Sequence, residues 1–208
     1  MAVSKANIIK SVFIDYILSQ IEEDIIIGNE VMYGSSGKIA DLILLHKGST
    51  YAIEIKSDAD NLNRIKDQIT EYQKQFDYTI VVSGEKHTDK LSKLLPDGIG
   101  LYMVSDNLTI SLLHRAKRQR KLNKDEMLFS IKTSYLVKIA DFSTNEYNAD
   151  EIRHQFTKKR TSCIQEILYN YWSNKLKPGF ECFMSERGEE TIVSDLSNFT
   201  SYKVSTVF

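Results

Sequence analysis

The sequence predicts an α/β protein in which helices flank a mixed β-sheet, followed by a mainly helical C-terminal extension. Helix-like and strand-like patterns alternate through the first half of the chain, and strand-like segments become rare beyond about residue 115. The 208 residues are 42% hydrophobic and 26% charged, which is normal for a globular protein with a sizeable core. Two prolines and nine glycines exclude collagen-like and low-complexity chains.

The first half contains a helix, three strands, a helix and a fourth strand. Residues 5–23 carry apolar side chains at spacings of three and four, which is the period of one helix face. After a break at Gly28-Asn29, strands are expected at 30–33, 39–46, 51–56 and 78–83. A helix with Asp60 as its N-cap should fill residues 60–76. This helix is a crossover, so the strands at 51–56 and 78–83 should be parallel and joined with a right-handed connection.

The remaining elements follow from the same patterns. We expect a helix at 87–95, strands at 99–104 and 108–113, and helices at 124–138, 149–174 and 189–199.

The basic run at 117–121 marks a change in composition, so we predict two domains, residues 1–114 and 115–208. Residues 1–113 contain 11 Lys/Arg and 16 Asp/Glu, a charge of 11 − 16 = −5, and the rest contain 16 and 12, a charge of +4. The basic second half hints at a polyanionic partner.

The composition also excludes several classes of protein. Cys163 and Cys182 have no metal-binding spacing, so we expect two buried thiols in a reducing cytosol. No apolar run is long enough to cross a membrane, and none resembles a signal peptide. We therefore expect a cytoplasmic protein without membrane partners.

One predicted hairpin carries ionisable residues where a core is expected. Asp41 interrupts an apolar strand, and Glu54 and Lys56 occupy the next strand. Side chains two residues apart share one face of a strand, and antiparallel pairing places Asp41 opposite that face. A buried carboxylate is unfavourable unless it is paired or bound to a metal. Two carboxylates suit Mg²⁺ or Mn²⁺, and a neighbouring lysine can act on a water molecule or on phosphate charge, which is the chemistry of phosphodiester hydrolysis.

These residues resemble the PD-(D/E)XK nuclease superfamily, which has the restriction-endonuclease-like fold. The match consists of Asp41 and the sequence Glu54-x-Lys56, although Ala40 stands where the superfamily usually has proline. Gln68-x-x-x-Tyr72 resembles an element of RecB-type nucleases. Residues 54–82 also resemble a bacterial family of predicted nucleases, through Glu54-Ile55-Lys56-Ser57, Asp60, Leu62, Arg64, Gln68, Tyr72 and Phe76-Asp77. The resemblance covers roughly residues 5–83.

The resemblance implies a divalent-metal-dependent nuclease that hydrolyses phosphodiester bonds, and we expect its substrate to be DNA. Asp41, Glu54 and the backbone carbonyl of Ile55 would hold the metal, with Glu30 as a further ligand. Lys56 would act on the water or the transition state, and Gln68 and Tyr72 would support the site. The resemblance does not extend to residues 115–208. From positive charge, we expect nucleic acid to contact Arg64, Lys117, Arg118, Arg120 and Lys121.

Ordinary structural roles compete with several of these assignments. Glu30 could be a surface charge, Gln68 a solvated helix residue, and residues 117–121 a linker. Tyr72 lies in the apolar stripe of its helix, so it should pack in the core even if its hydroxyl reaches the site, and Trp172 should be core as well. A non-catalytic nuclease-fold module that binds nucleic acid or a protein partner is the main alternative. The C-terminal lobe could also recruit a protein partner or form a homodimer.

Overall fold

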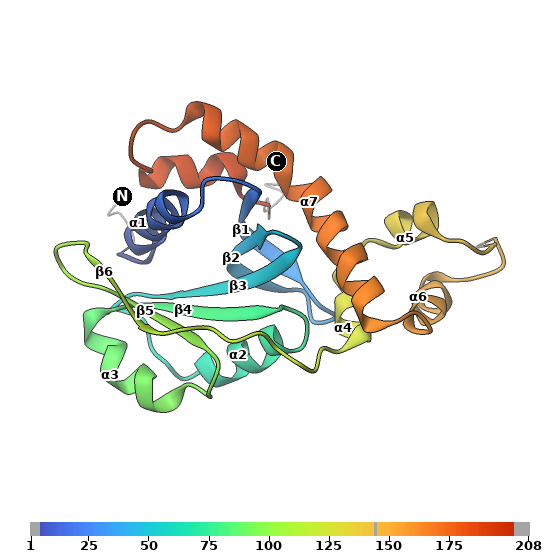
Figure 1. The fold of residues 1–208 in the computed structure, drawn as a ribbon, viewed down its shortest axis with the longest axis horizontal. Helices are drawn as coiled ribbons and strands as arrows, with labels where there is room; N and C mark the ends of the chain where they lie inside the picture. Colours follow the sequence, from blue (N-terminus) through green and yellow to red (C-terminus); the bar gives the residue numbers. More distant parts are fainter. Residues whose placement is uncertain (1–4, 144, 202–208) are drawn as a thin grey trace, which may run out of the picture.

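The computed structural model describes residues 5–143 and 145–201, in which a six-stranded sheet lies between two helical layers (Figure 1). The strands lie side by side in chain order. They are β1 (Ile25–Tyr33), β2 (Lys38–His46), β3 (Ser49–Lys56), β4 (Tyr78–Gly84), β5 (Gly100–Val104) and β6 (Ile110–His114). The helices are α1 (Lys5–Gln20), α2 (Ile65–Gln73), α3 (Glu85–Leu94), α4 (Lys124–Phe129), α5 (Thr133–Ile139), α6 (Ala149–Thr157) and α7 (Thr161–Glu186), followed by the 3-10 helix η1 (Val193–Phe199).

The sheet is mixed, as the sequence predicts. β1, β2 and β3 form an antiparallel meander, and β5 and β6 are also antiparallel. β3, β4 and β5 are parallel because α2 and α3 return the chain to the same edge. Tyr51 pairs with Tyr78 at the start of the first parallel pair, and Lys56 pairs with Ser83 at its end.

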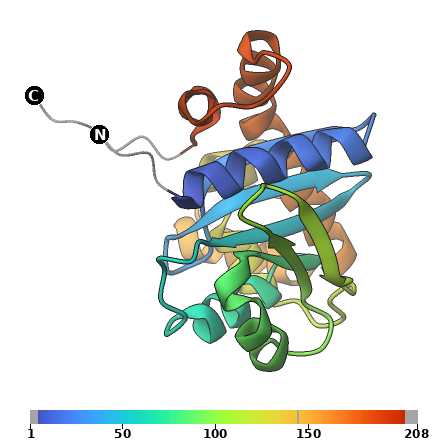
Figure 2. The same ribbon diagram turned by 90° about the vertical axis from the view of Figure 1, so that its left-hand side faces the viewer.

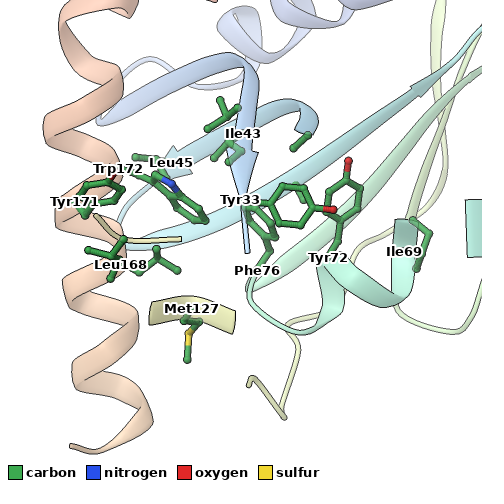
Figure 3. Packing of buried hydrophobic residues seen from close by; sticks show 14 of the residues in the cluster. Tyr33, Ile43, Leu45, Ile69, Tyr72, Phe76, Met127, Leu168, Tyr171 and Trp172 are labelled. Carbon is green, nitrogen blue, oxygen red and sulfur yellow. The ribbon is translucent and has the colours of Figure 1, made fainter. Parts of the chain in front are cut away.

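Each face of the sheet has its own hydrophobic core. On one face, α1 lies across the strands (Figure 2), and Phe13, Ile14 and Ile17 pack on residues such as Ile53. On the other face, α2 meets α4, α6 and the first part of α7. Figure 3 shows Trp172 of α7 beside Phe76 in this second core, with Tyr72 nearby. The Phe76 and Trp172 rings stack with centroids 5.0 Å apart, so Trp172 is core as expected.

The hydrophobic core on the α2 face continues into the C-terminal half. Met127, Leu128, Phe156 and Trp172 belong to the same buried cluster as Tyr72. The helix α7 runs past the sheet edge at β1, and η1 packs beside its C-terminal part (Figure 1). The helical extension is therefore anchored on the sheet, and the division at residues 114 and 115 stays a prediction.

The break predicted at Gly28-Asn29 is wrong, because β1 runs without interruption from Ile25 to Tyr33. The glycine has a packing role instead. A Cβ added at Gly28 would lie 2.8 Å from a methyl carbon of Leu176 and 2.8 Å from one of Val31. A glycine at this position lets α7 pack closely against the strand.

The N-cap predicted at Asp60 is also wrong, since α2 begins at Ile65. The Asp60 carboxylate instead accepts hydrogen bonds from the backbone N and the Oγ of Ser57, both at 2.7 Å. These bonds stabilise the loop after β3, and helix α2 begins only after this loop. The loop directly follows Lys56.

Other differences are in helix lengths and thiol exposure. The helices predicted at 124–138 and 149–174 are each divided, into α4 with α5 and α6 with α7, and α7 continues to Glu186. The expectation of buried thiols is wrong, because Cys163 and Cys182 are both free and exposed. Within residues 5–143 and 145–201, no helix combines the length and apolar character needed to cross a membrane.

Candidate functional site

The predicted ionisable residues meet around Glu54. This side chain is only 2% exposed and projects from β3 toward α2. Lys56 Nζ and Gln68 Nε2 donate hydrogen bonds to Glu54 Oε1 at 2.7 and 2.5 Å. The Tyr72 hydroxyl donates to Glu54 Oε2 at 2.6 Å. Both oxygens of the buried carboxylate are therefore held by side chains that the sequence singled out.

The spacing of Gln68 and Tyr72 explains why both reach Glu54. Residues four apart lie on the same face of a helix, one turn from each other. Tyr72 is fully buried, with its ring 5.2 Å from that of Tyr33. Burial and the nearby Glu54 charge raise the pKa of Tyr72, so its hydroxyl keeps its proton and acts as a donor. Core packing and a role in the site are thus compatible for this residue.

Asp41 lies opposite Glu54, where β2 and β3 separate. The antiparallel register ends at the pair Leu42 and Ile53, so Asp41 and Glu54 are the next pair in that register. Asp41 Oδ2 accepts a hydrogen bond of 2.8 Å from the backbone N of Ile55. Burial, followed by the charge of Glu54, raises the pKa of Asp41 to about 7. The buried carboxylate of Glu54 and the partly buried carboxylate of Asp41 therefore face each other, and they repel unless a proton or a cation lies between them.

Lys10 is a residue of this region that the sequence analysis missed. It projects from α1, is only 3% exposed, and its Nζ donates a 2.9 Å hydrogen bond to Asn29 Oδ1 and another to the Glu30 carboxylate. Its positive charge opposes the rise in the pKa of Asp41. The sequence did hold a signal, because Lys10 lies three residues before Phe13 within the apolar stripe of its helix.

Glu30 lies at an irregular point of β1. Its φ of 49° falls in the left-handed region, which is uncommon for residues other than glycine. Its neighbours Asn29 and Val31 pair with Leu42 and Ala40, so Glu30 lies across from Asp41. The negative charge of Glu30 contributes to the raised pKa of Asp41, while its own carboxylate is bound by Lys10. Glu30 is thus an ion-pair partner at the edge of the site.

The donor set fits a hard divalent cation. Asp41 and Glu54 supply opposed carboxylate oxygens, and the buried Oε1 of Gln68 has no hydrogen-bond partner among the residues that the structure describes. Oxygen donors of this kind match the preference of Mg²⁺, which keeps several waters and needs only one or two carboxylates. In the described part of the chain, no three His, Cys, Asp or Glu side chains come together as a metal cluster. A metal here would therefore depend on two carboxylates, a backbone carbonyl and water.

A cavity of about 290 Å³ adjoins the site. Gln68 forms part of its wall, together with Tyr33, Lys38, Ile39, Arg64 and Asp67. Arg64 is exposed at the start of α2, and Lys38 stands at the start of β2. Two cationic side chains therefore flank a hollow next to Glu54. Lys38 was missed by the sequence analysis because a single lysine beside a turn carries no distinctive pattern.

The basic run lies apart from this cavity. Arg118 donates hydrogen bonds of 3.2 and 3.0 Å to the buried carboxylate of Asp77, and the backbone N of Gln119 donates to the Asp77 carbonyl at 2.8 Å. Lys117, Arg118, Arg120 and Lys121 line a separate hollow of about 830 Å³ that shares no lining residue with the one beside Gln68. The structure thus fixes the run against the loop before β4, and it does not bring these residues to Glu54.

Comparison with known proteins places the chain in a phage family. Residues 2–200 match the family described as Bacteriophage P4 protein cII. The chain belongs to this family. Protein cII of Enterobacteria phage P4 is 24% identical over 189 residues, which cover 86% of this chain and 71% of the phage P4 protein. The family description names no enzymatic activity, so function is argued from the site.

A solved structure is also similar. It is a protein of unknown function from Silicibacter pomeroyi, with 18% identity and a TM-score of 0.44. The match covers 62% of this chain and 83% of that protein.

Proposed function

We propose that this protein is a divalent-metal-dependent nuclease that hydrolyses phosphodiester bonds, with DNA as its substrate. The observation that carries the proposal is the arrangement around Glu54, whose two oxygens are bound by Lys56, Gln68 and Tyr72 while Asp41 lies opposite. The resemblance of these residues to the PD-(D/E)XK superfamily supports the same function.

Asp41 and Glu54, with the backbone carbonyl of Ile55, are the proposed ligands of Mg²⁺ or Mn²⁺. When bound, such a cation lowers the pKa of a coordinated water and offsets phosphate charge. The two carboxylates come from adjacent strands, and Asp41 is anchored by the Ile55 backbone N. Their positions are therefore fixed by the sheet before any ligand arrives. Glu30 is assigned a weaker role, because Lys10 already binds its carboxylate.

Lys56 is the proposed catalytic cation. Its side chain is 11% exposed and its Nζ lies 2.7 Å from Glu54 Oε1. An ammonium group held at the mouth of the site can orient the attacking water and stabilise negative charge on the phosphate in the transition state. Gln68 and Tyr72 act as positioning residues, because they hold the Glu54 carboxylate in one orientation.

Arg64 and Lys38 are the proposed contacts for a backbone phosphate beside the site, since both line the cavity next to Gln68. Arg guanidinium groups favour phosphate oxygens through paired hydrogen bonds. The exposed basic residues at 117–121 provide a second surface for phosphates farther along the strand. A polyanionic substrate is thus recognised by charge around an acidic, metal-binding centre.

A non-catalytic module is the second candidate. Lys56, Gln68 and Tyr72 already satisfy both oxygens of Glu54 without a metal, and the net charge of the chain is −1. Such a site could be a buried polar network in a fold that only binds nucleic acid or a protein partner. This candidate predicts binding without cleavage.

Calorimetry and cleavage assays separate the two candidates. We expect the purified protein to bind Mn²⁺ and to cut DNA, and the double variant Asp41→Asn, Glu54→Gln to lose both properties. Lys56→Met should keep metal binding and lower the cleavage rate by at least about a hundredfold, because it removes only the charge that acts on the reacting groups. Asp89→Asn, at an exposed carboxylate of α3 outside the proposed ligand set and outside the cavity beside Gln68, is the matched control.

The possible results have distinct meanings. Loss of cleavage in Lys56→Met, with metal binding intact, supports the nuclease. Full cleavage by Asp41→Asn or Lys56→Met would overturn it. DNA binding without any cut in Mg²⁺ or Mn²⁺ would favour the non-catalytic module. Single-stranded DNA, duplex DNA and RNA should each be tested as substrates.

A further inference from the structure

A second hollow lies on the opposite face of the sheet from Glu54. It measures about 430 Å³ and lies between α1 and the strands β2 to β6. Ile53 lines it, whereas the next residue along β3, Glu54, projects to the other face, as alternation along a strand requires. The two sites are therefore separated by the sheet itself. Figure 2 shows α1, the blue helix, lying across this face beside the hairpin of β5 and β6.

Four tyrosines line this hollow, each from a different element. They are Tyr16 of α1, Tyr51 of β3, Tyr78 of β4 and Tyr102 of β5. All four are only partly buried. Within the described residues, none of their hydroxyl groups has a hydrogen-bond partner, and none is counted among the buried unpaired atoms. The rings thus form apolar walls, and the hydroxyl oxygens keep some solvent exposure.

The rings are arranged as two walls at different angles. Tyr51 and Tyr78 stack with centroids 4.6 Å apart and an angle of 11° between their planes. Tyr16 and Tyr102 meet edge to face at 5.7 Å and 64°. Stacked rings can be extended by another flat ring, because offset stacking of aromatic systems is favourable. The hollow is therefore suited to a planar aromatic ligand, and its volume lies within the usual range of about 300–1,000 Å³ for small-molecule sites.

Arg115 adds a positive charge to the wall of the hollow, which favours an anionic ligand. Its exposed side chain lines the same hollow and forms no ion pair with any residue that the structure describes. It lies near enough to Tyr102 for its charge to oppose the rise in the pKa of that tyrosine caused by burial. Gln20 at the end of α1 provides a further hydrogen-bonding group. No Asp or Glu is among the lining residues, so an anion at Arg115 meets no like charge in the wall.

We propose that this hollow binds a nucleotide unit, with its base stacked on the Tyr51 and Tyr78 pair and its phosphate bound by Arg115. A flat ring joined to an anionic group is the ligand that aromatic walls with one unpaired guanidinium recognise best. The unit can be a free nucleotide or part of a single strand, because both present the same base and phosphate. This proposal does not depend on a nuclease activity at Glu54.

Titration calorimetry with AMP, adenosine and inorganic phosphate tests the proposal directly. We expect saturable binding of AMP, weaker binding of adenosine, and little binding of phosphate alone. Arg115→Gln should weaken AMP binding about tenfold and leave adenosine binding unchanged, because the substitution removes only the phosphate contact. Arg160→Gln, at an exposed arginine before α7 that lines neither this hollow nor the one beside residues 117–121, is the matched control.

A second variant tests the aromatic wall. Tyr78→Leu keeps an apolar side chain at the wall but removes the stacking face, so it should weaken both AMP and adenosine. Circular dichroism shows whether Tyr78→Leu is folded. If Tyr78→Leu does not fold, Arg115→Gln still tests the proposal, because Arg115 is exposed. A short single-stranded oligodeoxyadenylate distinguishes the two sources. Tighter binding than that of AMP identifies a strand as the ligand, and equal or weaker binding identifies a free nucleotide.

Three results would overturn the proposal. The first is no saturable binding of AMP, adenosine or the oligonucleotide. The second is AMP binding that Arg115→Gln leaves unchanged. The third is equal binding of phosphate and AMP with no effect of Tyr78→Leu, which would indicate an anion site without base recognition.

Discussion

At the scale of single residues, the candidate site depends on how five charges near one end of the sheet are balanced. Asp41 and Glu54 oppose each other, Lys56 binds Glu54, and Lys10 binds Glu30 at the neighbouring strand. Each cation offsets one carboxylate, and Asp41 alone has no cationic partner among the ion pairs of the described residues. Burial is the main cause that raises the pKa of Asp41 to about 7, and the nearby charge of Glu54 adds to it.

The raised pKa of Asp41 gives the stability of the metal-free protein an unusual pH dependence. Unfolded aspartate titrates near 3.9, whereas folded Asp41 titrates near 7. Between these values the folded state binds more protons, so its stability falls as pH rises, by roughly 1.4 kcal/mol for each unit of pKa difference. Asp41→Asn removes this loss, so the variant should gain stability relative to the parent protein from pH 4 to pH 7.

Urea unfolding in EDTA at several pH values measures this effect. Mn²⁺ should reduce the difference between the two proteins, because a bound cation takes the place of the proton. A stability difference that stays constant across the pH window would contradict the assignment. Asp89→Asn serves again as the control, since this exposed acid of α3 lies away from Asp41 and Glu54.

Lys10 should be essential for the stability of the β1 edge. Lys10→Met leaves the Asn29 oxygen and the Glu30 carboxylate without their shared donor. We expect the free energy of unfolding to fall by about 1–3 kcal/mol. This is less than breaking a fully buried ion pair usually costs, because Glu30 is partly exposed. In the double variant Lys10→Met, Glu30→Gln, part of this loss should be recovered, since the uncompensated charge is gone. Equal stability of the single and double variants would show that the charge of Glu30 is unimportant.

At the scale of the elements, α2 and β1 determine the geometry of the site. Helix α2 delivers Gln68 and Tyr72 to Glu54 from a single face, which its sequence spacing predicts. Strand β1 connects the site to the C-terminal region, because the Asn29 amide donates to the Leu196 carbonyl and to Thr200 Oγ1. Residues 167 and 171 positions apart in the sequence are therefore joined at β1.

Close packing of α7 on β1 predicts a steric effect at Gly28. A Cβ at this position would lie within 2.8–2.9 Å of both Leu176 methyl carbons, well inside van der Waals contact. Gly28→Ala should therefore destabilise the protein by about 1–3 kcal/mol despite its small size. Leu176→Ala should be destabilising by itself, but the double variant should be more stable than the sum of the two losses implies. Urea unfolding measures the stability of the three variants. If the double variant lost the sum of the two single losses in free energy of unfolding, the two residues would not be in contact.

At the scale of the whole molecule, the C-terminal helices complete the core beneath the site. Trp172 stacks on Phe76, and Phe76 contacts Tyr72 and Tyr33 (Figure 3). A continuous set of aromatic rings thus leads from α7 to the hydroxyl that holds Glu54. The helical extension supports the site through packing, whatever its partners are.

Trp172→Ala should lower stability by about 3–5 kcal/mol, because it removes a fully buried side chain and leaves a cavity. Trp172→Phe should be much milder, since the indole Nε1 has no hydrogen-bond partner among the described residues to lose. Thermal unfolding measures both, and Met184→Ala, at an exposed position of the same helix, is the control. Equal effects of Trp172→Ala and Met184→Ala would contradict the role of this packing.

A resemblance to RecB-type nucleases placed Gln68 and Tyr72 at the site. The periodicity of the sequence by itself determined the order of the strands, the mixed sheet and the meeting of Asp41, Glu54 and Lys56. These features follow from local periods of two and 3.6 residues and from the rules of strand pairing, which act over short stretches of chain. Only the tertiary structure decided that Gly28 continues a strand, that Lys10 reaches Glu30, and that four tyrosines and Arg115 line one hollow. Those contacts join segments from distant parts of the chain, so no local pattern encodes them.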